Sequence, residues 1–126
     1  MNKYCVVLEI KLEHLEEYKK VHRNVWKDLL KSIKESGVKE EVMFFYNNLA
    51  IVYFEAEDLN KSYEIQRRSV ELEKGWEDLV GPWISKGEYK PGTYELAFLE
   101  KVFDLNEQLE EKNKDRCTNN TGRDVF

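Results

Sequence analysis

The sequence predicts an α+β fold, because two kinds of hydrophobic periodicity alternate along the chain. From Tyr4 to Ile10, apolar side chains recur at every second residue, which is typical of a strand. From Leu15 to Ile33 they recur at every third or fourth residue, which is typical of an amphipathic helix. Both patterns return in the second half of the chain, so strands and helices are expected to pack together.

The first helix is expected to run without interruption from about Glu13 to Glu35. One apolar stripe follows its whole length and comprises Leu15, Tyr18, His22, Val25, Trp26, Leu29 and Ile33. Gly37 comes just after this segment. Glycine is a common stop past the last helical turn, because it adopts the left-handed conformation without steric cost.

A β-hairpin is expected next, with strands over residues 40–46 and 49–56. Asn47 and Asn48 separate the strands, and asparagine tolerates the left-handed conformation of tight hairpin turns. Both strands are apolar on both faces, yet the helices can cover only one face of the sheet. We therefore expect a second copy of the chain to cover the other face, with Phe45 pointing outward. The alternative is that the C-terminal tail folds back over this face.

The rest of the chain is expected to supply a second helix and a last strand. Asp58 can cap a helix that begins at Leu59, and Gly75 is expected to break this helix before a short one over residues 76–80. The last strand is expected from Tyr94 to Asp104. Along it, one face is expected to hold Leu96, Phe98, Glu100, Val102 and Asp104, and the other Ala97, Leu99, Lys101 and Phe103.

The resulting order, β-α-β-β-α-β, is that of a ferredoxin-like fold, an antiparallel four-stranded sheet with helices on one face. We expect residues 1–105 to form this single domain. The polar, asparagine-rich segment 106–126 is expected to be a C-terminal tail, either a frayed helix or disordered.

The composition indicates a folded protein and narrows the range of partners. Hydrophobic residues make up 41% of the chain and aromatic residues 13%, which is enough to form a core. The formal net charge of −5 argues against binding to nucleic acid or anionic membranes, which favour basic patches. No apolar run approaches the length of a membrane span and the first residues lack a signal-peptide layout, so we expect a cytoplasmic protein.

The sequence contains no motif that predicts a metal or a cofactor. There is no P-loop, no GxGxxG pattern, no HExxH and no CxxC. Cys5 and Cys117 are too few and too far apart for a metal cluster, and they are expected to be free thiols. Any chemistry is therefore expected to depend on ordinary side chains.

His22 is the first candidate for such chemistry, because it lies on the apolar stripe of the first helix. Tyr18 precedes it by one turn and Trp26 follows it by one turn, so the three rings are expected to lie in a row. Two interpretations are open. His22 is either a hydrogen-bonded core residue or a group that exchanges protons near neutral pH, beside a tyrosine that orients a hydroxyl-bearing ligand.

Two other features allow two interpretations each, and a third allows one. Trp76 either anchors an irregular segment or contacts a ligand. Glu40 and Glu41 form either a carboxylate pair or a solvated strand end. The pair Arg67-Arg68 is expected to lie on a charged outer helix face.

These residues resemble the first-helix signature of the L-rhamnose mutarotases. Segment 17–29, EYKKVHRNVWKDL, contains the tyrosine, histidine, tryptophan and leucine of that signature, and Gly37 follows at the family's distance. Segment 73–79, EKGWEDL, is similar to the family's tryptophan-containing segment, and segment 96–105, LAFLEKVFDL, is similar to its closing strand. The resemblance covers roughly residues 3–105.

The resemblance implies a homodimeric α+β barrel and an isomerase that acts on a monosaccharide. Such an enzyme interconverts the α and β anomers of a 6-deoxy aldose, L-rhamnose or a related sugar such as L-fucose, without metal or cofactor. It further implies that His22 is the catalytic proton donor and that Tyr18 and Trp76 bind the sugar, with Trp26 of the same signature beside them.

Two positions depart from the family pattern. Gly75-Trp76 stands where the family has a tryptophan pair, and Glu41 stands where it has a sugar-contacting tyrosine. Glu41 is therefore expected to contact the sugar instead, and these departures leave the identity of the sugar open.

Mutarotation places one proton on the ring oxygen and takes one from the anomeric hydroxyl. His22 as the acid, with Tyr18 or Glu41 as its partner, would be a sufficient catalytic set. Two other functions remain open: a non-catalytic module that binds a small ligand, and a cofactor-free monooxygenase that shares the dimeric barrel.

Overall fold

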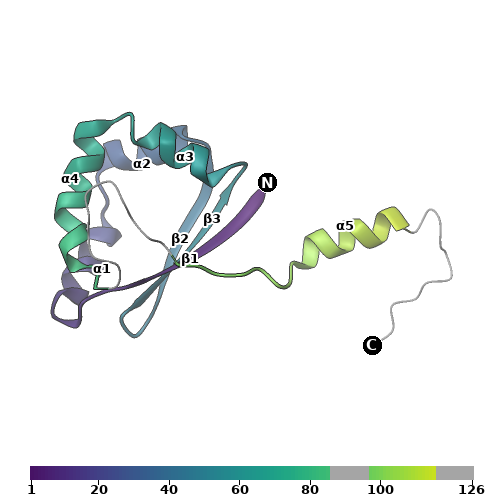
Figure 1. Ribbon diagram of the computed structural model, residues 1–126, viewed down its shortest axis with the longest axis horizontal. Coiled ribbons are helices and arrows are strands. Elements are labelled where there is room, and N and C mark those ends of the chain that lie inside the picture. Colours follow the sequence, from purple (N-terminus) through teal and green to yellow (C-terminus); the bar gives the residue numbers. More distant parts are fainter. Residues whose placement is uncertain (86–96, 116–126) are drawn as a thin grey trace.

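The computed structural model describes residues 1–85 and 97–115, and it confirms the ferredoxin-like arrangement (Figure 1). One antiparallel sheet has the strand order β2-β3-β1-β4, with β1 Asn2–Glu9, β2 Val38–Tyr46, β3 Leu49–Ala56 and β4 Ala97–Phe98. The helices are η1 Leu12–His14, α1 Leu15–Arg23, α2 Lys27–Glu35, α3 Leu59–Gln66, α4 Val70–Val80, η2 Gly81–Trp83 and α5 Leu105–Asp115. Helices α1 to α4 cover one face of the sheet, whereas α5 extends away from it.

The hairpin turn determines which side chains of β2 face the helices. Asn47 has a positive φ of 54° and closes the predicted two-residue turn. The alternation that starts at this turn directs Phe45 inward, where its ring meets the edge of Tyr18 with 6.0 Å between ring centroids. It directs Phe44 outward, with 63% of the residue exposed. The expectation that Phe45 points outward is therefore wrong, because the register of the hairpin turns it inward.

A β-bulge lies at the other end of β2. Glu41 pairs with Phe54 and Glu40 with Glu55, but the next pair joins Val38 to Ala56, so β2 carries one extra residue here. Residues three apart normally lie on opposite faces of a strand, and the extra residue cancels this difference. Val38 and Glu41 consequently both face the helices.

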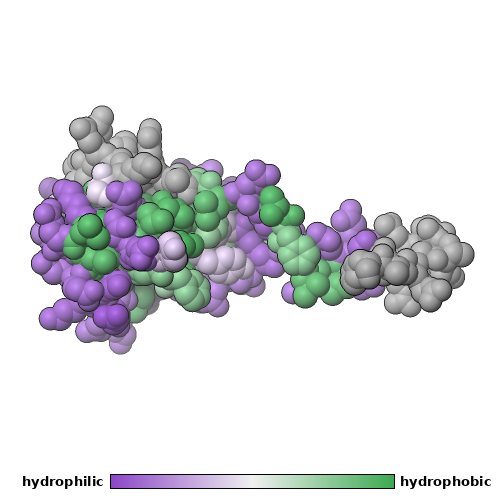
Figure 2. Space-filling model, turned by 90° about the horizontal axis from the view of Figure 1, so that it is seen from below, coloured by the Kyte–Doolittle hydropathy of each residue, from purple (hydrophilic) through white to green (hydrophobic). Residues whose placement is uncertain are grey.

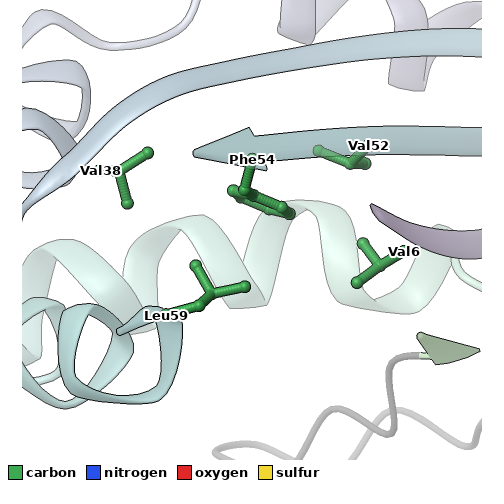
Figure 3. Close-up of a cluster of buried hydrophobic side chains, with 5 residues drawn as sticks. All are labelled: Val6, Val38, Val52, Phe54 and Leu59. Carbon is green, nitrogen blue, oxygen red and sulfur yellow. The ribbon is translucent and has the colours of Figure 1, made fainter. Parts of the chain in front are cut away.

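The core lies between the sheet and the helices in two clusters of buried side chains. The first consists of Val6, Val38, Val52, Phe54 and Leu59, which converge between the strands and the helices in Figure 3. The second consists of Ile10, Tyr18, Ala50, Val80 and Ile84. Each fully buried aliphatic side chain contributes about 1.5–3 kcal/mol, so these two clusters hold the helices on the sheet.

The first helix is broken, although the sequence predicts it to be continuous from Glu13 to Glu35. Asn24 has φ −146° and ψ 67°, and the chain is extended at Trp26 before α2 begins. A straight helix of that length would measure about 35 Å, since each residue adds about 1.5 Å. An eight-residue strand spans only about 26 Å. The break keeps both α1 and α2 over the sheet.

Gly75 does not interrupt a helix, contrary to expectation. Helix α4 runs through it from Val70 to Val80, and the break before α4 falls after Gln66. The ring of Trp26 lies over Gly75, where an added Cβ would stand 3.5 Å from it. The glycine thus provides room for a neighbouring ring. The cap at the start of α3 is confirmed, because the Asp58 side chain accepts a hydrogen bond from the Lys61 backbone N–H.

The last strand is shorter than predicted within the described residues. Only residues 97–98 pair with β1, while residues 99–104 are irregular and residues 94–96 lie outside the described ranges. The irregular segment is tied to β1 at both ends: the Leu99 backbone N–H donates to the Cys5 carbonyl at 2.8 Å, and Lys3 Nζ lies 2.6 Å from Asp104 Oδ2. Asp104 Oδ1 also accepts from the Glu107 backbone N–H and so starts α5. The first part of the predicted tail is therefore helical.

The sheet face opposite the helices is apolar, as the sequence predicts. Phe44 and Tyr46 are exposed on it, with exposed fractions of 63% and 68%. In Figure 2, hydrophobic side chains gather on the body and continue along the arm that leads to α5. Helix α5 points away from the sheet, so residues 105–115 do not cover this face.

Two glycines give a matched test of these backbone assignments. Gly37 has a φ of +104°, so Gly37→Ala should lower the free energy of unfolding by about 1 kcal/mol or more, since alanine is strained there. Gly75 lies within α4, so Gly75→Ala should raise the free energy of unfolding by up to about 1 kcal/mol. Urea unfolding of both variants measures the two changes. Destabilisation by Gly75→Ala would show that the Trp26 ring cannot tolerate a methyl group.

Candidate active site

A hollow of ≈ 280 Å³ lies between the inner face of the sheet and the helices. Its apolar lining includes Val6, Leu8, Met43, Val52, Phe54 and Val80. Its aromatic and polar lining includes Tyr18, Glu41, Tyr63, Gln66, Arg67, Glu73, Trp76 and Glu77. Polar groups from four elements therefore converge on an otherwise apolar cavity, which is the common form of a small-molecule site.

Glu41 enters the hollow from β2. It shares the inward row of that strand with Met43 and Phe45 and occupies a place where an apolar residue would be the usual choice. Water still reaches the residue, but the surrounding walls desolvate its carboxylate, and this burial raises the pKa of Glu41 to about 7. Among residues 1–85 and 97–115, no side chain makes an ion pair or a hydrogen bond with it. It is thus available to a ligand.

Two tyrosines lie opposite Glu41. Tyr18 on α1 is only 2% exposed, and Tyr63 on α3 is half-buried. Burial, followed by the negative charge of Glu41, raises the pKa of both hydroxyls, so they remain protonated donors at neutral pH. Within the described ranges the Tyr18 hydroxyl has no hydrogen-bond partner. It can therefore donate to a ligand in the hollow.

His22 lies behind this wall and is held by Tyr18. Its Nδ1 lies 2.7 Å from the Tyr18 carbonyl oxygen, and the two rings stack with 4.2 Å between centroids. A carbonyl only accepts, so Nδ1 carries the hydrogen and the neutral ring keeps its lone pair on Nε2. Burial lowers the pKa of His22, an effect that the hydrogen bond partly opposes. At neutral pH the uncharged form prevails, and that form accepts a proton.

The tryptophans complete one aromatic row. Trp76 lines the hollow, and its ring meets His22 edge-on at 5.2 Å between centroids. Trp26 packs edge-on against the outer side of Trp76 at 5.3 Å and is 41% exposed. Tyr18, His22, Trp76 and Trp26 are thus in sequential contact, although only Tyr18 and Trp76 line the hollow. Trp26 supports Trp76 from behind.

Five of the polar and aromatic lining residues were not singled out as site residues by the sequence, namely Tyr63, Gln66, Arg67, Glu73 and Glu77. Tyr63 and Glu73 come from α3 and α4, and Arg67, expected on an outer face, reaches the rim of the hollow. Burial, and next the neighbouring Glu77, raise the pKa of Glu73, while Arg67 opposes the change. The only available signal was helical spacing, since Glu73 precedes Trp76 by three residues and so shares its helix face.

Neither a metal site nor a membrane span is found in the described residues. Among residues 1–85 and 97–115, no three His, Cys, Asp or Glu side chains come together in a metal-binding group. Within the same ranges, every helix is too short or too polar to cross a bilayer.

Comparisons with known proteins agree with this arrangement. A family model described as L-rhamnose mutarotase matches residues 3–105. A UPF0734 protein of Dictyostelium discoideum is 31% identical over 77 residues, which cover 59% of this chain. The chain spans 62% of the length of that relative.

Three solved structures share the fold. An L-rhamnose mutarotase from Formosa agariphila is 19% identical with a TM-score of 0.61, covering 83% of this chain and 99% of its own. Tetracenomycin F2 cyclase from Streptomyces glaucescens, a type-II polyketide cyclase, is 21% identical with a TM-score of 0.58, covering 83% and 97%. A dimeric ferredoxin-like protein from an uncultured marine organism is 14% identical with a TM-score of 0.54, covering 81% and 90%.

The sheet and its helices therefore define a ferredoxin-like α+β protein, the class to which these structures also point. Within that class, the match over residues 3–105 shows that the chain belongs to the L-rhamnose mutarotase family, a family of isomerase-type enzymes. The resemblance noted in the sequence is confirmed.

The environment of Glu41 predicts a pH-dependent stability. Its pKa rises from 4.5 to about 7 on folding, so the folded state holds this proton more tightly than the unfolded state. The resulting stabilisation is complete below about pH 4.5 and is lost as the pH rises through about 7. The glutamine of Glu41→Gln has no proton to lose in this range. The melting temperature of this variant, relative to that of the unmodified protein, should therefore increase between pH 5 and pH 8.

Thermal melts of both proteins across this range measure the difference. Glu40→Gln is the matched control, because Glu40 is the neighbouring residue on the outward face of β2. Its difference from the unmodified protein should stay constant. A constant difference for Glu41→Gln as well would contradict the raised pKa.

Proposed function

We propose that this protein is a sugar mutarotase that interconverts the α and β anomers of L-rhamnose or a related 6-deoxy aldose such as L-fucose. The observation that carries the proposal is the hollow, which joins an aromatic wall at Trp76 to the hydroxyl of Tyr18 and the carboxyl of Glu41. An aromatic ring stacks on the apolar face of a sugar, and the polar groups bond its hydroxyls. Membership of a sugar mutarotase family supports this assignment.

The size of the hollow is also consistent with a monosaccharide. Its volume of ≈ 280 Å³ lies just below the range of about 300–1,000 Å³ that is usual for ligand pockets. Glu41 replaces the tyrosine that the family uses to contact the sugar, so we propose that the hydroxyl pattern of the preferred sugar differs accordingly. L-fucose is the alternative substrate to test beside L-rhamnose.

The reaction opens the sugar ring and closes it again. The ring oxygen gains a proton as its bond to C1 breaks, and the anomeric hydroxyl loses a proton as C1 becomes an aldehyde. Rotation about the C1–C2 bond followed by closure gives the other anomer. A positioned acid–base group contributes about 10²–10⁴-fold, and no metal or cofactor is required.

We propose that His22 is a catalytic residue in this exchange. The proton-donor role expected from the sequence needs the imidazolium form, which burial disfavours. The neutral ring, with its lone pair on Nε2, suits removal of the anomeric proton instead. Tyr18, Trp76 and Glu41 bind the sugar, and Trp26 holds Trp76 in place.

A second function remains to be tested against this one, namely a non-catalytic module that binds a small ligand. Saturation-transfer NMR with a panel of aldoses separates the two, because a mutarotase speeds the exchange between anomers whereas a binding module does not. Oxygen uptake in the presence of a quinol would indicate the third candidate, a cofactor-free monooxygenase.

We also propose a homodimer formed through the sheet faces. The exposed Phe44 and Tyr46 lie on an apolar face that no described helix covers, and a structural neighbour is a dimeric ferredoxin-like protein. We place the activity in the domain of residues 1–105, with residues 106–126 outside the site. A cytoplasmic enzyme that needs neither nucleic acid nor membrane fits this proposal.

His22→Asn tests the catalytic role. Asparagine keeps a polar amide that can donate to the Tyr18 carbonyl, but it cannot exchange a proton near pH 7. The rate of anomer exchange should fall about 10²-fold or more, with little change in the melting temperature. His14→Asn is the control, since His14 lies in η1 outside the hollow, and it should exchange at the unmodified rate. An active but destabilised His22→Asn protein would make His22 a core residue only.

Light scattering tests the dimer. The unmodified protein should have about twice its chain mass of 15.1 kDa at micromolar concentration. Phe44→Lys would place an unpaired charge in the interface, so it should shift the protein towards the monomer. Leu12→Lys changes an apolar residue that is 75% exposed outside the sheet and should leave the mass unchanged. A monomeric unmodified protein would rule out the proposed interface.

A further inference from the structure

Glu41 differs from every other residue in its row on the sheet. Between Glu41 and the hairpin turn, the inward residues Met43 and Phe45 pack on the buried clusters. On the other side of Glu41, beyond the bulge, Val38 is itself buried. Glu41 itself is exposed, but it lines the hollow, and in the described ranges it has no ion pair or hydrogen bond. A carboxyl group that lines a cavity without a partner is a candidate for function.

Its position gives it access to whatever occupies the hollow. Glu41 lines the cavity from the sheet side, while Tyr18 and Trp76 line it from the helix side. His22 does not line the hollow, and it lies behind Tyr18 and Trp76. A sugar stacked on Trp76 would therefore have Glu41 on its sheet side. On its helix side it would have Tyr18 and Trp76, with His22 behind them.

We propose that Glu41 is the acid of the reaction, whose protonated carboxyl gives its proton to the ring oxygen of the sugar. This inference rests on the proposed mutarotase function and deepens it. As the bond between C1 and the ring oxygen breaks, its electron pair moves to the ring oxygen, which takes the proton from Glu41. The anomeric O–H proton passes to Nε2 of His22 through a water molecule, because the His22 ring does not line the hollow. The electrons of that O–H bond form the C=O bond of the aldehyde.

The reverse steps restore both groups. After rotation about C1–C2, the hydroxyl oxygen attacks C1 and gives its proton to the Glu41 carboxylate. The imidazolium of His22 returns its proton to the aldehyde oxygen. Every proton and electron pair is accounted for, and no co-reactant is needed.

The surroundings of Glu41 favour the protonated form that the step requires. The titratable and charged groups that share the hollow are Tyr18 on α1, Tyr63 on α3, Arg67 just after it, and Glu73 and Glu77 on α4. None of these charged groups causes the shift at Glu41, for which desolvation is the cause. Desolvation, which raises the pKa of Glu41 to about 7, keeps about half of the carboxyl protonated at neutral pH.

The sign of the pH dependence distinguishes this role from the alternatives. If Glu41 is the acid, kcat/KM for anomer exchange falls as the pH rises through about 7, because the required proton is lost. If Glu41 were a base, kcat/KM would rise through the same region. If the His22 imidazolium were the acid, the fall would occur below the ordinary histidine pKa of about 6.5, and His22→Asn would abolish it.

The experiment measures exchange of L-rhamnose and L-fucose by saturation-transfer NMR from pH 5 to pH 9, after subtraction of the spontaneous rate. Glu41→Gln should lose about 10²-fold in kcat/KM and should no longer show the falling limb. Glu40→Gln, changed on the adjacent outward residue, should keep both the rate and the profile. Glu41→Asp retains a carboxyl that is one methylene shorter, so it should keep the falling limb at a lower rate.

A second readout does not depend on activity. In protein labelled with ¹³C at glutamate carboxyl groups, one resonance should titrate near pH 7, and Glu41→Gln should remove it. This titration also shows that the unmodified site has the required protonation state.

Each outcome supports or overturns the inference. Loss of rate and of the falling limb in Glu41→Gln, with a folded protein by thermal melt, supports it. An active unmodified protein whose Glu41→Gln variant keeps the rate or the falling limb overturns the inference and leaves the mutarotase function intact. An unmodified protein that accelerates exchange of neither sugar overturns the proposed function, and the inference with it.

Discussion

The alternation of side chains along the β2–β3 hairpin is the constraint on which the rest of the structure depends. The two-residue turn at Asn47 fixes the register, and with it the direction of every side chain of β2 up to Glu41. The bulge then changes the phase, so that Val38 joins the core without displacing Glu41 from the inner face. A strand without the extra residue would satisfy only one of these two positions.

The same constraint separates the two surfaces of the sheet by chemistry. Glu41, Met43 and Phe45 of β2 face the helices, and the first two line the hollow, whereas Phe44 and Tyr46 form an apolar outer surface. The outer face is thus apolar in addition to the inner face that carries the core, whereas an antiparallel sheet with one face in water usually has a polar outer face. This pattern is consistent with the proposed homodimer on the outer face and the proposed sugar site on the inner one.

Local patterns in the sequence predict most of the fold and the aromatic part of the site. The strands, the hairpin turn and the cap at Asp58 follow from periodicity and turn chemistry, because these depend on residues close in sequence. The break at Asn24 and the continuity of α4 through Gly75 do not, because both result from packing between α2 and α4 around Trp26. No local signal marks either of them.

The polar part of the site was less accessible to sequence reasoning. Glu40 and Glu41 are chemically identical neighbours, and only the register of the hairpin decides that Glu41 enters the hollow. Tyr63 and Glu73 reach the same cavity from two further helices, which tertiary packing brings together. The protonation of His22 depends on a backbone carbonyl one turn earlier, a partner that residue type alone does not specify.

The strand order also determines the order in which the sheet can be assembled during synthesis. Strand β1 is made first, yet it lies between β3 and β4, and its partners on β3 are distant: Glu9 pairs with Leu49 and Asn2 with Ala56, which are 40 and 54 positions later in the chain. The β2–β3 hairpin is local and can close as soon as it emerges, because its loop is short. It therefore provides the edge onto which β1 docks. An error of one residue in this early hairpin would turn the side chains of β2 to the opposite face, and the finished domain would hold its carboxyl group in water, outside the cavity.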